Sequence, residues 1–334
     1  MKKMKNLTKT DVMHVLKIAS WILLVVVLLA VFFFLLPKML PFLLEKSFSN
    51  DTGDKLTTYG QMGDSYGIFN ALFSGLAFLG VLLTIFFQSR DNKKRTVAEQ
   101  FYQMLDVQQK VIEEINVSQV RKAKKDEPVK VMNGRKAFVE FKIQMKYLMR
   151  DINKVVEEEG FELTPVDIAD ISYAIFFYGS APSWKPFMLQ VLKDYDDVER
   201  LVDAIIAKLD SNKRYILIRP NQNYLSVYFR NMYNAIKLID NCKLFSQKEK
   251  EGYVKILRAQ LSNAELYIMF FNIISRFGKK WIEKDYITKY QLIQNLHPKY
   301  CDGYNPKEFF PNIKFEGEES CLSPFKQEVV KRDS

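Results

Sequence analysis

The chain has 334 residues, with 49 Lys and Arg against 39 Asp and Glu and a formal net charge of +10, and 48% of its residues are hydrophobic. An apolar fraction near one half excludes a disordered chain, and 13 Gly with 11 Pro exclude a fibrous or low-complexity protein. Three cysteines, none of them in a Cys-x-x-Cys pair, exclude a disulfide scaffold and a thiolate zinc site.

Two apolar runs without a charged residue lie in the first quarter of the chain, at residues 18–36 and 68–87. As a helix, each run would extend for about 28–30 Å, close to the hydrocarbon thickness of a bilayer. A cleaved signal peptide is the alternative for the first run. That run is longer than a signal-peptide core, however, and Pro-Lys follows it instead of a small-residue cleavage site. The sequence therefore predicts two transmembrane helices, over 18–44 and 68–88.

The charges beside these runs predict their orientation. Residues 1–17 carry five lysines against one aspartate, the connector 45–67 has a net charge of −2, and residues 89–95 have a net charge of +3. Because positively charged flanks stay in the cytoplasm, both termini are expected there, with a short hairpin loop outside. The lipid bilayer is thus the first expected partner.

The second predicted span carries small residues at helical spacing, namely Gly67, Ala71, Gly75 and Gly80. Small residues allow helices to approach closely in lipid. They favour packing against the first span of the same chain or, as the alternative, a homo-oligomer formed through the second span. Farther along, the basic segment 121–130 could contact anionic lipid or nucleic acid, or could be a solvated loop.

Most of the remaining chain has the apolar periodicity of helices. We expect helices over 96–117, 134–157, 195–209, 222–241, 246–261, 262–277 and 282–296. Another helix should begin at Thr164-Pro165, and Ser246 with Glu249 and Ser262 with Glu265 form capping-box patterns. The run 214–220 is a short strand or an extended connector.

The expected fold class is therefore mainly α, with a two-span transmembrane hairpin followed by a helical cytosolic domain. Its expected parts are a basic N-terminus (1–17), a first span (18–44), an external loop (45–67), a second span (68–88), the cytosolic domain (89–297) and an irregular tail (298–334).

No recognised catalytic pattern is present. The chain lacks a phosphate-binding loop, a dinucleotide fingerprint, a zinc-protease motif and a nucleophile elbow. Its two histidines are His14, beside the first span, and His297, after the last expected helix, and neither has an evident acidic or thiol partner. We therefore expect a protein that is not an enzyme and has no catalytic residue, cofactor or metal, although a carboxylate-only site stays open.

A polar centre is expected where the helices from 222 to 277 meet. Glu265 lies in the first turn of a helix whose neighbouring residues are apolar, so this carboxylate should be buried and should need a partner, for which arginine is well suited. The expected members are Arg230, Tyr233, Asp240, Arg258, Ser262, Glu265 and Asn272. Such a centre is either a structural network or a binding site for an anionic ligand or partner, because arginines lie beside aromatic residues.

Several segments resemble the bacterial abortive-infection family typified by AbiC. They are FSGLAFLGVLLTIFFQSRD at 73–91, GRKAF at 134–138, YFRNMYNAIKLID at 228–240, YVKILRAQLSNAEL at 253–266 and YQLIQNL at 290–296. The resemblance implies defence against bacteriophage, by which an infected cell stops supporting phage growth. It implies no catalytic residues. Together with the two predicted spans, it makes the bacterial inner membrane the expected location.

Three functions are compatible with these features. The leading hypothesis is a membrane-anchored anti-phage effector whose cytosolic helical domain senses an infection cue or binds a partner. Its two-span hairpin would hold the protein at the inner membrane or perturb that membrane. The alternatives are a membrane-tethered nuclease or nucleic-acid-binding protein, suggested by the basic charge, and a membrane receptor or scaffold without toxicity. The sequence does not identify the trigger or the means by which growth is arrested.

Overall fold

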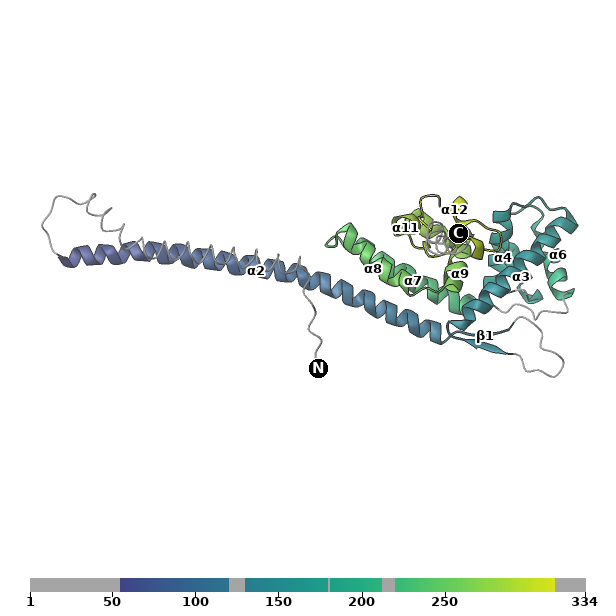
Figure 1. Ribbon diagram of the computed structural model, residues 1–334, viewed down its shortest axis with the longest axis horizontal. Helices are drawn as coiled ribbons and strands as arrows, with labels where there is room; N and C mark the ends of the chain where they lie inside the picture. The colour runs from purple at the N-terminus through teal and green to yellow at the C-terminus, as the bar shows by residue number, and fades with distance from the viewer. Residues whose placement is uncertain (1–54, 120–129, 180, 212–219, 316–334) are drawn as a thin grey trace, which may run out of the picture. The chain divides into compact units, whose positions relative to one another are not determined.

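The computed structural model describes residues 55–119, 130–179, 181–211 and 220–315, and these are mainly helical, which confirms the expected fold class at that level (Figure 1). The chain divides into two units, residues 1–84 and 85–334. Several predictions lie wholly or largely outside the described residues: the basic start, the first span, the basic loop 121–130, the run 214–220 and the tail beyond 315.

Helix α2 (Lys55–Glu113) contains the second predicted span. It begins at Lys55, so residues 55–67, which we expected in the external loop, are helical. The described part of the chain has one helix that is long and apolar enough to cross a membrane, Asn70–Glu113, and none of its apolar window is buried. From Leu72 to Phe87 ten large apolar residues are 45–63% exposed, and Phe73 is partly buried.

The second unit consists of short and medium helices with one small sheet. Its helices are α3 (Lys136–Glu159), α4 (Pro165–Tyr178), η1 (Pro182–Trp184), α5 (Lys185–Val191), α6 (Val198–Ser211), α7 (Gln222–Asn241), α8 (Gln247–Ala259), α9 (Asn263–Ile274), η2 (Arg276–Gly278), α10 (Lys279–Glu283), α11 (Tyr286–Lys289), η3 (Pro298–Tyr300) and α12 (Pro306–Phe309). The strands β1 (Asn116–Ser118) and β2 (Val131–Asn133) pair antiparallel, with Val117 opposite Met132.

Side-chain caps explain where three of these helices begin. Thr164, Ser246 and Ser262 each accept a hydrogen bond from the backbone amide three residues later, and the acidic residue at that position bonds back to the cap amide. This reciprocal arrangement satisfies donors that a helix start otherwise leaves unpaired. The expected starts of α4, α8 and α9 are confirmed.

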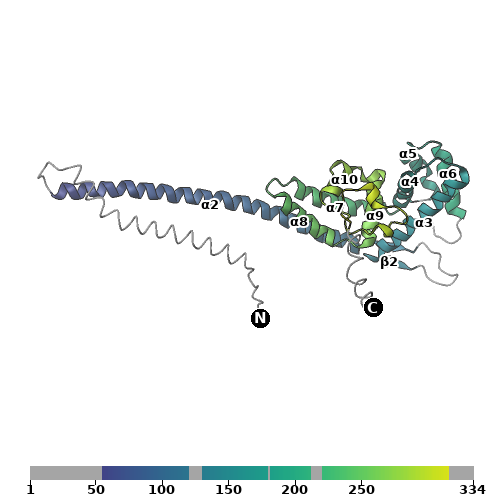
Figure 2. The ribbon, with the colours of Figure 1, turned by 45° about the horizontal axis from the view of Figure 1, so that its top comes forward.

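Helix α9 is the centre of the second unit. Its residues from Ala264 to Ile273 are all buried, as its almost uniformly apolar sequence indicates. Figures 1 and 2 place it between α7 and α8 on one side and α3 and α4 on the other, and both α3 and α4 pack against it. After α9 the chain folds back so closely that a Cβ atom at Gly278 would lie 2.3 Å from the Ile273 Cα, so this position requires glycine.

Three parts of the unit differ from expectation. The tail from residue 298, expected to be irregular, begins with the short helices η3 and α12. The predicted helix 282–296 is instead the end of α10, the four-residue α11 and a series of turns, with left-handed backbone at Asp285 and Gln291. The β1–β2 pair, which brackets the basic loop, was not expected, because each strand is only three residues long.

Candidate functional site

Glu265, at the start of α9, is the most deeply buried residue of the predicted polar centre, and its side chain has no exposed surface. Its Oε2 accepts a hydrogen bond from the Ser262 amide (2.8 Å), and the Tyr228 hydroxyl on α7 donates to Oε1 (3.1 Å). Burial and the adjacent carboxylate raise the pKa of Tyr228 well above its ordinary value, so the hydroxyl keeps the proton that it donates.

Arg135, just before α3, supplies the positive charge. Its Nε lies 3.5 Å from Glu265 Oε2, and its Nη2 donates to Gln109 Oε1 on α2 (3.2 Å). The Arg135 side chain is 45% exposed, so the ion pair connects a fully buried carboxylate to a solvent-accessible guanidinium. The need for an arginine partner was predicted correctly, but the arginine comes from the GRKAF segment.

The two arginines expected at this centre are placed elsewhere. Arg230 is exposed, and its assignment to the centre was wrong. It follows Tyr228 by two residues, about 200° around a helix, so it points outward when Tyr228 points inward. Arg258 instead donates from Nη1 to the Gln291 carbonyl oxygen (2.8 Å) and joins α8 to the turn after α11.

Asn272 is buried on α9 but belongs to a separate contact. It lies seven residues beyond Glu265, about 10 Å along the helix. Its Nδ2 donates to the Tyr173 hydroxyl on α4 (2.9 Å). Within the described residues its Oδ1 has no hydrogen-bond partner. Glu265 and Asn272, which we expected in one centre, therefore lie at opposite ends of α9.

Asp240 and Tyr233 face α10 and α11. Asp240 Oδ1 accepts hydrogen bonds from Lys289 Nζ (2.5 Å) and the Tyr290 hydroxyl (2.6 Å). Partial burial opposes ionisation of Asp240, but these bonds and the Lys289 charge together lower its pKa. The Tyr233 ring packs edge-on against Trp281, with ring centroids 5.2 Å apart. Through these two residues, α7 contacts α10 and the end of α11.

A fourth polar cluster, formed by Asp170, Arg276 and Tyr195, was not predicted. Asp170 on α4 accepts bonds from the Arg276 amide (2.8 Å), Nε (2.9 Å) and Nη2 (2.7 Å), and from the Tyr195 hydroxyl (2.8 Å). The Asp170 side chain is only 10% exposed. A lone carboxylate inside the apolar run of α4 was the available sequence signal, but its partner lies 106 residues away.

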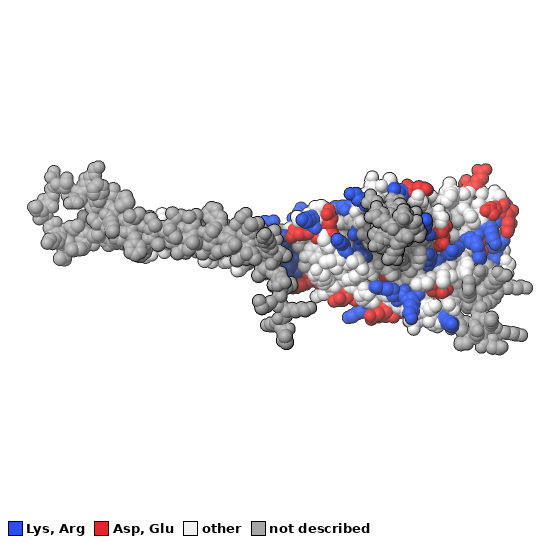
Figure 3. Space-filling model, in the orientation of Figure 1, with Lys and Arg blue, Asp and Glu red and all other residues white. Residues whose placement is uncertain are grey.

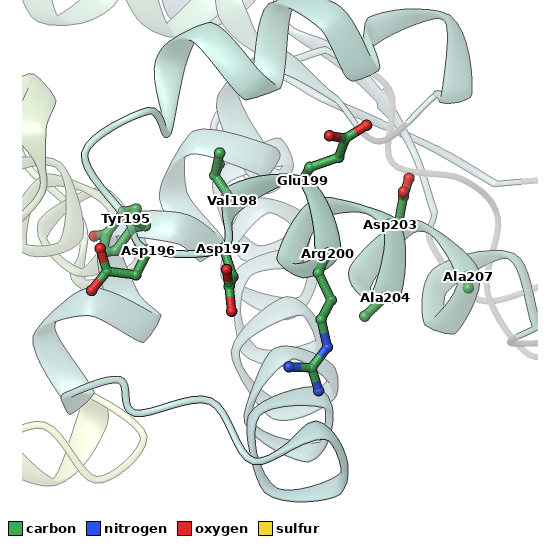
Figure 4. Close-up of a pocket in the computed structure, with 9 residues that line it drawn as sticks. All are labelled: Tyr195, Asp196, Asp197, Val198, Glu199, Arg200, Asp203, Ala204 and Ala207. Carbon is green, nitrogen blue, oxygen red and sulfur yellow. The ribbon is translucent and has the colours of Figure 1, made fainter.

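A shallow surface depression lies where α6 begins (Figure 4). Its lining residues are Tyr195, Asp196, Asp197, Val198, Glu199, Arg200, Asp203, Ala204 and Ala207. Arg200 donates to the Glu159 carbonyl oxygen (2.7 Å), and Lys185 pairs with Asp203 (2.6 Å). Within the described ranges no three His, Cys, Asp or Glu side chains are grouped to hold a metal ion.

His297 is exposed, and its Nδ1 accepts a hydrogen bond from the Lys299 amide (3.2 Å). This bond gives the side chain a local role as the cap of η3. This cap is a structural reason for a histidine at this position.

Cys301 lies in a buried polar group beside Lys142. Lys142 Nζ donates to the Tyr300 carbonyl oxygen (3.1 Å), and burial lowers the pKa of this lysine. Tyr267 donates to Asp302 Oδ2 (3.0 Å). The Cys301 side chain is fully buried, and this burial raises the pKa of its thiol to about 12. Such a thiol should be inert.

We expect Cys301 to resist maleimide in the folded protein. At pH 8 a thiol with a pKa of about 12 is ionised in about one molecule in ten thousand. In a Cys242→Ser, Cys321→Ser variant, labelling should therefore be at least about a hundredfold slower than for an unfolded chain. A variant keeping only the partly exposed Cys242 is the control, and rapid labelling of Cys301 before unfolding would contradict this prediction.

Residues 220–300 match the model of a family described as "Putative phage abortive infection protein". The matched segment runs from the residue before Asn221 through α7, α8, α9, α10 and α11 to η3, and it contains three of the five motifs on which the resemblance was based. The family suspected from the sequence is thereby confirmed for this segment. Comparisons with curated proteins and with solved structures gave no match.

Proposed function

We propose that this protein is a membrane-anchored effector of abortive-infection type, which acts against bacteriophage from the inner membrane of a bacterium. The description of the matched family points to phage abortive infection. The membrane anchor and a role for the second unit in sensing an infection cue or binding a partner are our additions.

The exposed apolar surface of α2 is the observation that carries the anchor. Ten large apolar side chains between Leu72 and Phe87 are each at least 45% exposed, and no charged residue interrupts them. A soluble protein rarely leaves so large a continuous apolar surface in water. A helix of this length and composition matches the hydrocarbon thickness of a bilayer. Lipid is therefore the environment that we assign to it.

The charges that follow this segment support an orientation with the second unit in the cytoplasm. Arg90, Lys93, Lys94 and Arg95 follow the apolar run, and they are accompanied by only one acidic residue, Asp91. We assign these positive residues to the cytoplasmic face. The two-pass topology, with both termini cytoplasmic, remains part of the proposal.

We further propose that the protein acts without catalysis. The buried carboxylates Glu265 and Asp170 are both held by hydrogen bonds and ion pairs within the second unit. Contacts of this kind stabilise a fold, and we propose that this fold serves binding. We also propose that α2 associates with a second helix, since Cβ atoms added at Gly67, Gly75 and Gly80 would meet no atom within 4 Å.

The proposed anchor is tested by placing charges in the middle of the apolar segment. Leu79→Arg with Leu83→Arg, made together with Val26→Arg in the first predicted span, should remove the protein from the membrane fraction and should abolish protection in a phage-plating assay, because charged side chains are costly at the bilayer centre. Leu79→Ile, Leu83→Val and Val26→Ile together are the matched control and should keep both properties. Full protection by a cytosolic form of the charged variant would reject the membrane anchor.

A second candidate function is a membrane-tethered nucleic-acid-binding protein or nuclease. The observation that favours it is the charge of the matched segment, in which 13 Lys and Arg stand against six Asp and Glu. Basic surfaces of this kind attract nucleic acid. Induced expression with simultaneous readouts of membrane potential and RNA integrity separates the two functions, because depolarisation supports the membrane effector and cleaved RNA supports the nuclease.

A further inference from the structure

We infer that the connection between α7 and α8 binds the anionic phospholipid headgroups of the bilayer that α2 crosses. The proposed surface consists of Lys243 from this connection, Lys248 from the first turn of α8, and Arg90 and Lys93 from α2, all of them exposed. The inference rests on the membrane anchor proposed above. It adds a second membrane contact, formed by the segment that matches the family.

The contact between α2 and α8 determines how far this surface lies from the apolar segment of α2. Lys94 Nζ lies 2.9 Å from Glu249 Oε1 and 5.8 Å from the centroid of the Phe245 ring. Hydrogen bonds from the Ser246 amide and from Lys94 lower the pKa of Glu249 to about 2, so this carboxylate stays ionised at neutral pH. The start of α8 is therefore held beside residue 94 of α2.

Residue 94 lies close to the end of the apolar segment. It follows Gln88, the first polar residue after the uncharged run, by six residues, or about 9 Å of helix. The headgroup region is about 5–8 Å thick on each side of the hydrocarbon core. Lys94 and the start of α8 are thus expected at the outer edge of the headgroups, within reach of lysine side chains.

The charge of the connection suits such a surface. Residues 241–248 contain two lysines and no acidic residue. The carboxylates that flank this stretch in the sequence are engaged, Asp240 by Lys289 and Tyr290, and Glu249 by Lys94. Figure 3 shows Lys and Arg side chains over the described surface of the second unit. Basic residues next to a span are attracted to anionic lipid.

The position of Lys248 argues against a purely structural purpose. It lies in the first turn of α8, where the helix dipole disfavours a positive charge. Its charge therefore does not serve the stability of α8. Nucleic acid is the competing anionic partner, but the contact through Lys94 places these lysines at the bilayer surface, which favours lipid.

Hydrogen–deuterium exchange of the full chain in lipid nanodiscs tests the inference. Backbone amides of residues 241–250 should exchange severalfold more slowly in discs that contain phosphatidylglycerol than in discs of phosphatidylcholine alone. Lys243→Glu with Lys248→Glu should remove this difference. Because Glu at position 248 suits the start of a helix, the variant should stay folded, and its melting temperature checks that.

The matched control is Lys154→Glu with Lys193→Glu, which makes the same change in charge at two exposed lysines of α3 and of the segment after α5. It should keep the lipid-dependent protection. Incorporation into discs without any effect of phosphatidylglycerol would overturn this inference but leave the anchor intact. Failure to enter discs would overturn both. Protection by an added RNA oligonucleotide, but not by phosphatidylglycerol, would assign the surface to nucleic acid instead.

Discussion

Asp170→Ala should lower the free energy of unfolding by about 3–5 kcal/mol, which is typical of the loss of one member of a buried ion pair. Asp170 is 10% exposed and accepts four hydrogen bonds, three from Arg276 and one from Tyr195. Its removal leaves the Arg276 guanidinium with only the longer contact to the exposed Asp194 (3.8 Å) as an ion pair. It also removes the bonds that hold η2 to α4. Because η2 directly follows α9, the packing around α9 should be weakened as well.

Chemical unfolding of the full chain in detergent, followed by circular dichroism, measures this effect. Asp203→Ala is the control, because the Lys185–Asp203 pair is also close (2.6 Å) but the aspartate is 54% exposed. Exposed pairs typically contribute about 0–1 kcal/mol. If both substitutions lower stability equally, the Asp170 cluster does not stabilise the fold in the way that we describe.

The central helices could be predicted from the sequence because local signals define them. The range expected for α7, residues 222–241, is the observed Gln222–Asn241, and the caps at Ser246 and Ser262 mark α8 and α9. In each case a capping residue or an amphipathic stripe acts within a few residues of the helix that it defines. These signals do not depend on how the helices pack.

The prediction of a helix over 282–296 was wrong for a physical reason. Its residues Ile287, Leu292 and Leu296 are buried, as the apolar pattern indicated. Apolar periodicity, however, reports which side chains are buried and does not report which backbone hydrogen bonds form. Here the left-handed conformation of Asp285 and Gln291 breaks the helix, and nothing in the local sequence requires it.

The polar contacts show the same limit. The burial of Glu265 could be predicted from its apolar neighbours, and so could its need for a partner. Its partner Arg135 could not, because the two residues are brought together only by the packing of α3 and α9. The members expected from α7 likewise included both Tyr233, which packs against Trp281, and Arg230, which is exposed.

Glu265→Ala should destabilise the protein by about 2–4 kcal/mol. The substitution removes the reciprocal half of the Ser262 capping box, and loss of a cap costs about 1 kcal/mol. It also leaves the fully buried Tyr228 hydroxyl without its acceptor, which costs about 1–3 kcal/mol. The half-exposed Arg135 can be hydrated by solvent, so its loss of a partner should add little.

Glu265→Gln separates a structural network from a binding site. The amide oxygen can still accept from either Tyr228 or the Ser262 amide, so stability should fall by only about 1 kcal/mol. A structural network predicts that this variant keeps its phage protection, because the fold is retained. A site that needs the Glu265 charge predicts a stable protein without protection. Equal unfolding free energies for the Ala and Gln variants would contradict the hydrogen-bonding role, because only the Gln side chain can replace the lost acceptor.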